Sequence, residues 1–78
     1  LAYAINEIVE GRRLTQASAA EVLGIPQPKI SSLKNYKLEG FSVERLMTFL
    51  TSLDRDVEIS IRKRASSKSP AKITVVAA

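Results

Sequence analysis

The side chains best suited to bind another molecule gather between residues 27 and 37. No acidic residue occurs in this segment, which contains three lysines, two amides and two serines: Lys29, Lys34, Lys37, Gln27, Asn35, Ser31 and Ser32. Ammonium groups neutralise phosphates, and amides and hydroxyls can add hydrogen bonds to them. The segment therefore indicates a polyanionic partner, although a basic run is equally often a solvated loop.

A second basic segment lies between residues 62 and 72, again without an acid: Arg62, Lys63, Arg64, Lys68 and Lys72. The formal net charge of the chain is +4, and most of its basic groups lie in these two segments. We expect the second one to be a mobile loop, with contact to a nucleic-acid backbone as the alternative.

The composition argues against catalysis. The 78 residues include no histidine and no cysteine, which removes the commonest general base, the commonest metal ligand and thiolate chemistry. No two carboxylates have an informative spacing. No apolar run approaches the roughly 20 residues that a membrane span needs. We expect a non-enzymatic protein of a soluble, reducing compartment, with no metal or cofactor and no membrane partner.

Helical periodicity begins at the first residue. Leu1, Ile5 and Ile8 share one face of a helix that we expect to end at Gly11, the residue tolerant of positive φ. Because the pattern is already under way at Leu1, we expect further residues before it in the natural protein. Thr15 is the predicted N-cap of a short second helix, and Gly24 its predicted end.

The sequence "GIPQPKIS", residues 24–31, raises the question of whether its two prolines break a helix or start one. Proline is costly inside a helix but fits the first turn, where the backbone N–H groups have no intrahelical partner. A helix that begins near Pro26 places both Pro26 and Pro28 in that turn. Ile30 and Leu33 then share its inner face. We conclude that the prolines start a third helix.

A fourth helix and two strands complete the predicted elements. Ser42 is the expected N-cap of the fourth helix, whose apolar stripe is formed by Leu46, Phe49, Leu50 and Leu53. The pattern then alternates, which predicts strands over residues 57–61 and 73–77. A two-stranded hairpin alone is barely stable. We expect it to lie on a helix or to pair with another chain.

The second and third predicted helices form a helix-turn-helix signature. They are joined across a turn of about four residues and have small residues at their contact. The nine residues from Gln27 to Asn35 extend about 13 Å, enough to reach several base edges in a B-DNA major groove. The core prediction for this unit is Ala17, Ala20, Leu23, Ile30 and Leu33.

The stretch "LTQASAAEVLGIPQPKISSLKNYK" resembles the helix-turn-helix domains of the phage Cro/C1 (XRE-like) repressor family. From residue 2 to about residue 62, the chain is similar to the branch that includes bacterial HigA-type antitoxins. Its most specific residues are Thr15-Gln16-Ala17, Ala20, Leu23-Gly24-Ile25, Ile30-Ser31 and Leu33. The resemblance implies a mainly α, lambda-repressor-like core of four or five helices in the bacterial cytoplasm. It also implies two-fold dimers on palindromic operators and, often, a RelE-like ribonuclease toxin as a second partner.

The resemblance also implies roles for individual residues. Gln16 and Gln27 match paired glutamines at the starts of the two helices, which in the family buttress each other and contact phosphate or adenine. Ser32 matches a base-reading position, and Asn35 matches a residue that contacts the DNA backbone.

Three positions depart from the family pattern. Pro26 replaces the usual serine or threonine cap. Pro28 replaces a polar base-reading residue, so that contact is lost or becomes apolar. Tyr36 stands where a glycine often ends the helix, so the backbone geometry after the third helix is not predicted.

Two function classes follow from these expectations. The first is a sequence-specific transcriptional repressor that is also an autoregulatory antitoxin, with residues 1–55 as the DNA-binding domain. Its predicted DNA contacts are Gln16, Gln27, Pro28, Lys29, Ser31, Ser32, Lys34, Asn35 and Lys37. The alternative is a protein-interaction module that neutralises a RelE-like toxin, with DNA binding secondary. In both, residues 56–78 form two strands with a basic connector that join a homodimer or bind a partner through Val57, Ile59, Ile61, Ile73 and Val75.

Overall fold

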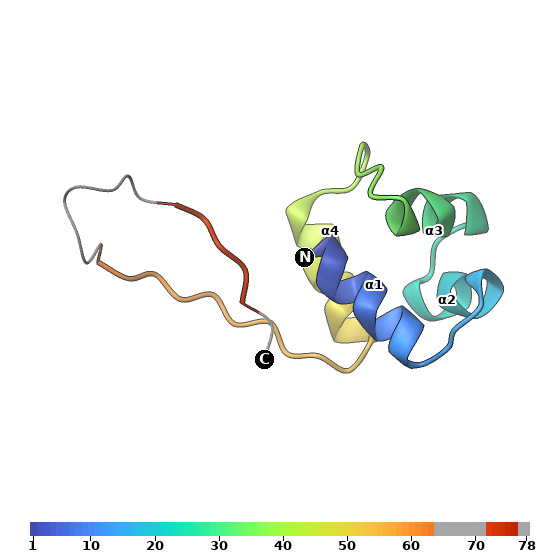
Figure 1. The fold of residues 1–78 in the computed structure, drawn as a ribbon, viewed down its shortest axis with the longest axis horizontal. Coiled ribbons are helices and arrows are strands. Elements are labelled where there is room, and N and C mark those ends of the chain that lie inside the picture. The colour runs from blue at the N-terminus through green and yellow to red at the C-terminus, as the bar shows by residue number, and fades with distance from the viewer. Residues whose placement is uncertain (64–71, 77–78) are drawn as a thin grey trace.

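The computed structural model of the chain describes residues 1–63 and 72–76. The described residues form four helices: α1 (Ala2–Gly11), α2 (Gln16–Leu23), α3 (Gln27–Lys34) and α4 (Val43–Ser52). Figure 1 shows the helices packed into one body, with the described residues up to Lys63 leaving it after α4 as an extended segment. The predicted mainly α, four-helix fold is confirmed. None of the described helices has the length and apolar character needed to cross a membrane.

One apolar core joins the four helices. Ile5 of α1, Leu33 of α3 and Leu53 after α4 have the largest fully buried side chains. The other buried residues are Ala2, Ala19, Leu23, Ile25, Ile30, Leu46, Phe49 and Leu50. The predicted apolar stripe of α4 and the predicted inner face of α3 are therefore confirmed.

The inner face of α2 differs from the prediction at one position. Ala17 is exposed, whereas Ala19 is completely buried and Ala20 is half-buried. Residues two apart on a helix point in nearly opposite directions at 3.6 residues per turn. The inner face of α2 therefore follows Ala19 and Leu23, and the prediction of Ala17 as a core residue is wrong.

The predicted helix starts are confirmed by their capping contacts. The Thr15 hydroxyl accepts a hydrogen bond from the Ser18 N–H at 3.1 Å, and the Ser42 hydroxyl accepts one from the Arg45 N–H at 3.1 Å. Pro26 is the N-cap of α3, with extended backbone at φ −63° and ψ 150°. Pro28 lies in the first turn of that helix, as predicted, whereas Pro26 precedes the first turn instead of lying in it. The prediction that the prolines mark a helix start is confirmed, and the placement of Pro26 inside the first turn is wrong.

All four helices are followed by a residue in the left-handed conformation. Gly24 takes this conformation after α2, at φ 67°, as predicted. Gly11 is still helical, and the left-handed residue after α1 is Arg13 at φ 54°. The expectation that Gly11 supplies positive φ is therefore wrong. Tyr36 and Asp54 take the same conformation after α3 and α4, at φ 58° and 60°.

The predicted two-stranded β element is not found in residues 1–63 and 72–76. Only Val57 packs partly against the core. Ile59, Ile61 and Ile73 are 73%, 95% and 98% exposed, and Val75 is exposed as well. Alternation predicts a strand only where one face is buried. In the single chain no helix covers these segments, and a hairpin without such support is marginal. The connector residues Arg64 to Ala71, and Ala77, lie outside the described residues.

Candidate nucleic-acid interface

A tight turn joins α2 to α3. The N–H groups of Gly24 and Ile25 both donate to the carbonyl of Ala20, the second at 3.1 Å. Ile25 is buried, so its side chain anchors the turn in the core. Pro26 follows at once as the cap of α3. The left-handed glycine, the buried isoleucine and the proline thus fix the direction in which α3 leaves α2, and the predicted helix-turn-helix is confirmed.

Most of α3 faces outward. Of its eight residues, only Ile30 and Leu33 are buried, and they hold the helix against the rest of the body. Gln27, Pro28 and Lys34 are exposed. Eight residues extend about 12 Å, which matches the width of a B-DNA major groove. Figure 1 shows α3 at the edge of the body, on the side away from the extended C-terminal segment.

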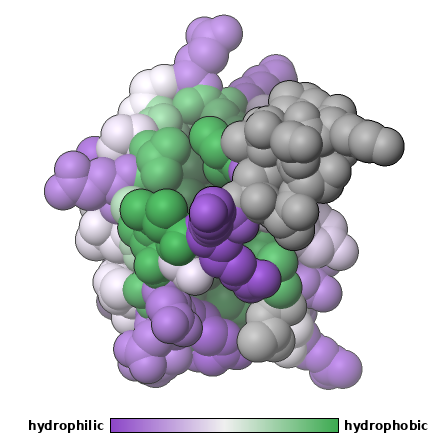
Figure 2. Space-filling view, turned by 90° about the vertical axis from the view of Figure 1, so that its left-hand side faces the viewer, coloured by the Kyte–Doolittle hydropathy of each residue, from purple (hydrophilic) through white to green (hydrophobic). Residues whose placement is uncertain are grey.

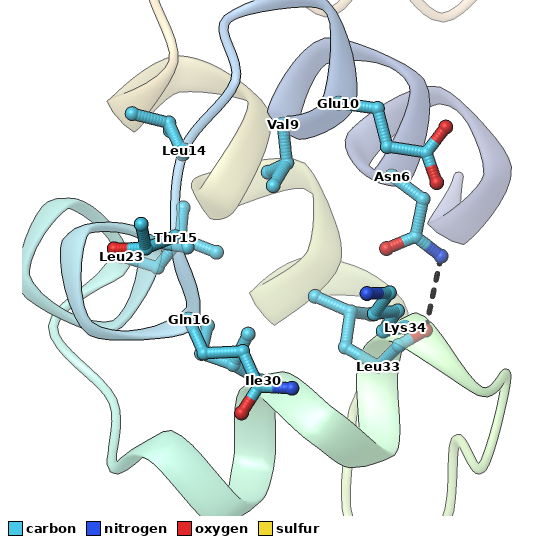
Figure 3. A pocket seen from close by; sticks show the side chains of 11 residues that line it. Asn6, Val9, Glu10, Leu14, Thr15, Gln16, Leu23, Ile30, Leu33 and Lys34 are labelled. Carbon is cyan, nitrogen blue, oxygen red and sulfur yellow. Dashed lines mark hydrogen bonds between the residues drawn. The ribbon is translucent and has the colours of Figure 1, made fainter.

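The two predicted glutamines occupy equivalent places. Gln16 is the first helical residue of α2, and Gln27 is the first of α3. Both side chains are exposed, and α2 packs directly on α3. Gln16 and Ile30 line the same cavity (Figure 3), so the start of α2 lies beside α3. Both amides are thus placed on the same helix-turn-helix unit, with their donors and acceptors open to solvent.

Two of the predicted contact residues are turned back onto α3. The Ser32 hydroxyl donates to the carbonyl of Pro28 at 3.1 Å. The Asn35 amide nitrogen donates to the carbonyl of Ser31 at 2.9 Å. Ser31 and Ser32 are half-buried. In the free protein, the Ser32 oxygen and the Asn35 carbonyl oxygen therefore retain acceptor capacity, while one donor of each side chain is already used.

The chain after α3 is held by its own backbone. The Lys37 N–H donates to the carbonyl of Ser32 at 2.8 Å, and the Tyr36 N–H donates to the carbonyl of Leu33 at 3.1 Å. This pair of bonds around a left-handed residue is the Schellman motif. Tyr36 therefore occupies the left-handed position at which the family often has a glycine. Lys37 and Lys34 remain exposed on the end of the helix-turn-helix unit.

Lys29 departs from the expected arrangement. Its ammonium nitrogen lies 5.4 Å from the centre of the Phe41 ring, over the loop between α3 and α4. The side chain is exposed, but it is directed along the protein surface. The sequence did not identify Phe41 as its partner. The available signal was an aromatic residue directly before the cap Ser42, a position that favours packing onto the helix that follows.

Two further contacts were missed at the sequence level. The Asn6 amide of α1 donates to the carbonyl of Leu33 in α3 at 3.0 Å. The Arg12 guanidinium donates to the carbonyl of Leu53 at 2.6 Å, across the end of α4. Asn6 could have been noticed because it is a polar residue next to the apolar face of the first helix. Its partner depends on tertiary packing, which no local pattern specifies.

A cavity of about 160 Å³ lies between α1, α2 and α3 (Figure 3). Its interior side is apolar, and Asn6, Glu10, Gln16 and Lys34 contribute polar groups to its lining. It lies beneath two of the predicted DNA contacts. Its chemistry is mixed, with one carboxylate and one ammonium group among mostly apolar side chains.

Comparison with known proteins places this geometry in a family. The family described as "Helix-turn-helix domain" matches residues 1–62, which contain all four helices. Among solved structures, the chain is similar to one named "Putative XRE Family Transcriptional Regulator", with a TM-score of 0.92 and 64% identity. That match covers 99% of this chain and 86% of the other. No curated protein matches the chain. The chain belongs to the helix-turn-helix domain family and has the fold of an XRE-family transcriptional regulator.

Proposed function

We propose that this protein is a transcriptional repressor that binds an operator by inserting α3 into the major groove. The observation that carries the proposal is the outward face of α3, held on the body by only two buried residues, Ile30 and Leu33. That face presents Gln27 at one end and Lys34 at the other, and both are exposed. A glutamine amide can pair with a base edge, and lysines neutralise phosphates on either side of the groove.

The remaining predicted residues are assigned by their position on this unit. Gln16, Lys34, Asn35 and Lys37 lie at helix ends, where contacts to phosphate are expected. Pro28, Ser31 and Ser32 belong to the part of α3 that would enter the groove. Pro28 offers only apolar atoms, which suit the methyl group of thymine.

A homodimer is part of the proposal. A single small module buries only about 600–1,000 Å² on DNA, which limits its specificity. Two copies related by a two-fold axis would read a palindrome with half-sites about 34 Å apart. The C-terminal segment supports such an assembly because Ile59 and Ile61, together with Ile73, are largely exposed to water in the single chain. Figure 2 looks onto the side from which this segment projects and shows apolar surface there, interrupted by hydrophilic side chains.

Capture of a RelE-like toxin by residues 56–78 is the second candidate. The same exposed apolar side chains favour it, because an extended segment can bind along a partner protein. In that case the protein would be an autoregulatory antitoxin of the HigA type. A toxin and a second copy of the chain would then compete for Ile59, Ile61, Ile73 and Val75.

Selection from a random duplex library tests the main proposal. The full chain is used to enrich 30-base-pair duplexes over several rounds at physiological salt. We expect a palindromic consensus with two half-sites, and at least a hundredfold preference over a scrambled duplex of equal composition. Enrichment without any consensus would refute the operator-binding role. A stable complex with a co-expressed small basic ribonuclease would then favour the second candidate.

A further inference from the structure

Lys29 belongs to a row of two cations and two aromatic rings that crosses from α3 to α4. Its ammonium nitrogen lies over the Phe41 ring, and Phe41 meets Phe49 edge to face, with ring centres 6.0 Å apart and planes at 76°. The Arg45 guanidinium lies 5.7 Å from the centre of the Phe49 ring. Both the edge-to-face geometry and the cation–ring distances are those of favourable contacts. We call these four residues the cation–aromatic row.

The row is anchored in the core at one end. Phe49 is 3% exposed, whereas Phe41 is half-buried and Lys29 is exposed. The row therefore links an exposed position of the reading helix to a buried residue of α4. It does so through Phe41, which lies between the α3–α4 loop and the cap of α4.

Gly40 makes room for the contact. It takes φ 82°, and a Cβ atom added there would lie 3.3 Å from the Lys29 ammonium nitrogen. This position thus combines a left-handed backbone with a close approach by a charged group. The loop passes under the Lys29 side chain at the same point where it turns toward α4.

We propose that Lys29 is a positioning residue of the DNA-binding surface, not a ligand of DNA. Its ammonium group holds the Gly40–Phe41 part of the α3–α4 loop against α3, beyond the backbone turn that already holds Lys37. This fixes that part of the loop beside the outward face of α3. The inference rests on the proposed function and refines it. It assigns to Lys29 a role that acts through Phe41, in place of the phosphate or base contact expected from its charge.

The first test uses the free protein and does not require DNA. A cation above a ring places the Lys29 ε-methylene protons in the shielding region of Phe41. We expect these protons to resonate upfield of their random-coil position in NMR spectra, and the shift to vanish in Phe41→Leu. An unshifted signal in the wild-type chain would show that the contact does not form and would overturn the proposal.

The second test is a double-mutant cycle on operator binding, with Lys29→Met, Phe41→Leu and the double variant. An exposed cation–ring contact corresponds to about two- to fivefold in an equilibrium constant. We expect each single variant to weaken binding by about that factor. We expect the double variant to be no weaker than either single variant, because both remove the same contact. Lys29→Arg, which keeps a cation over the ring, should bind within about twofold of wild type.

Salt dependence separates positioning from a direct contact. If Lys29 positions the loop, Lys29→Met leaves the slope of log K against log salt unchanged. A slope that falls by about 1.8 for the dimer, or about 0.9 for each lost phosphate contact, together with losses that multiply in the double variant, would make Lys29 a phosphate ligand and overturn the proposal. If the wild-type chain prefers no duplex, the proposed function and the positioning role both fail, and the proton shift still reports separately whether the contact exists.

Discussion

The side-chain amide of Asn6 in α1 donates a hydrogen bond of 3.0 Å to the backbone carbonyl of Leu33 in α3. This carbonyl lies in the last turn of α3, where intrahelical donors run out. It also accepts the Tyr36 N–H that closes the left-handed turn. One backbone oxygen thus joins α1, the end of α3 and the chain that leaves it.

We predict that Asn6→Ala lowers the free energy of unfolding by about 1 kcal/mol, because the half-buried donor is lost. Urea denaturation followed by circular dichroism measures the change. Asn35→Ala is the matched control. Its amide also donates to a backbone carbonyl, but within one helix and on the surface, so its loss should cost less than about 0.5 kcal/mol. Equal effects would mean that the link between α1 and α3 contributes nothing beyond a surface contact.

The second prediction concerns the left-handed residues after α1 and α2, where substitutions should change the free energy of unfolding in opposite directions. Gly24→Ala should destabilise the protein by about 1–2 kcal/mol, since φ 67° disfavours a Cβ atom. Arg13→Gly should stabilise it by about 0.5–1 kcal/mol, since Arg13 is an exposed residue at φ 54°. Thermal unfolding of both variants beside the wild type gives the signs. A destabilising Arg13→Gly would show that its left-handed conformation is not strained.

Salt sensitivity of DNA binding is the third prediction. With a few phosphate contacts per subunit, a dimer should release on the order of 4–6 counterions, which gives a log–log slope of a few units. Fluorescence anisotropy with a labelled operator, repeated at several salt concentrations, measures this slope. A slope near zero is incompatible with binding through Lys34 and Lys37.

Base reading is tested by two substitutions on the same unit. Gln27→Ala should weaken operator binding by about 1–3 kcal/mol and relax the preference at one position of each half-site. Lys37→Ala should weaken binding to operator and random DNA alike, because a phosphate contact carries no base identity. The measurement is the affinity of each variant for a cognate duplex and for a scrambled duplex, each compared with the wild-type affinity. If Gln27→Ala lowers the two affinities equally, α3 does not read bases from this end.

The fifth prediction concerns assembly. Val57 packs partly against the core, so a truncation should retain it. We expect a chain that ends at Glu58 to sediment as a monomer that binds DNA weakly and without operator preference. The matched control keeps full length and replaces four apolar residues by serine: Ile59, Ile61, Ile73 and Val75. It should be monomeric as well. A dimer that survives both changes would place the interface on the helical body.

The elements with local signals were predictable from the sequence. Thr15 and Ser42 are caps because a hydroxyl reaches a nearby N–H group, and Pro28 fits the first turn for reasons internal to its own helix. These effects act within four residues. Such local rules specify the boundaries of the helices, which is why the sequence predicts the helix-turn-helix.

The predictions that the structure did not confirm concern features that depend on residues distant in sequence. Alternation from Val57 to Ile61 fits a strand, but a strand also needs a neighbour, which the single chain does not supply. Whether Ala17 or Ala19 is buried depends on where the other helices lie against α2. The sequence indicates an uncontacted cation at Lys29, because only the path of the α3–α4 loop places Phe41 beneath it. In each case the missing information is a tertiary partner.

The exit of the chain from α4 has a consequence for how binding events combine. The Arg12 guanidinium holds the Leu53 carbonyl, and the Arg55 N–H donates back to the carbonyl of Leu50 at 2.9 Å. These bonds direct the C-terminal segment away from the side that carries α3 (Figure 1). A protein bound to that segment and a duplex bound to α3 would therefore approach the helical body from different sides. Because such a protein would compete with a second copy of the chain for the segment, we expect the two binding events to influence each other through the number of subunits on the DNA.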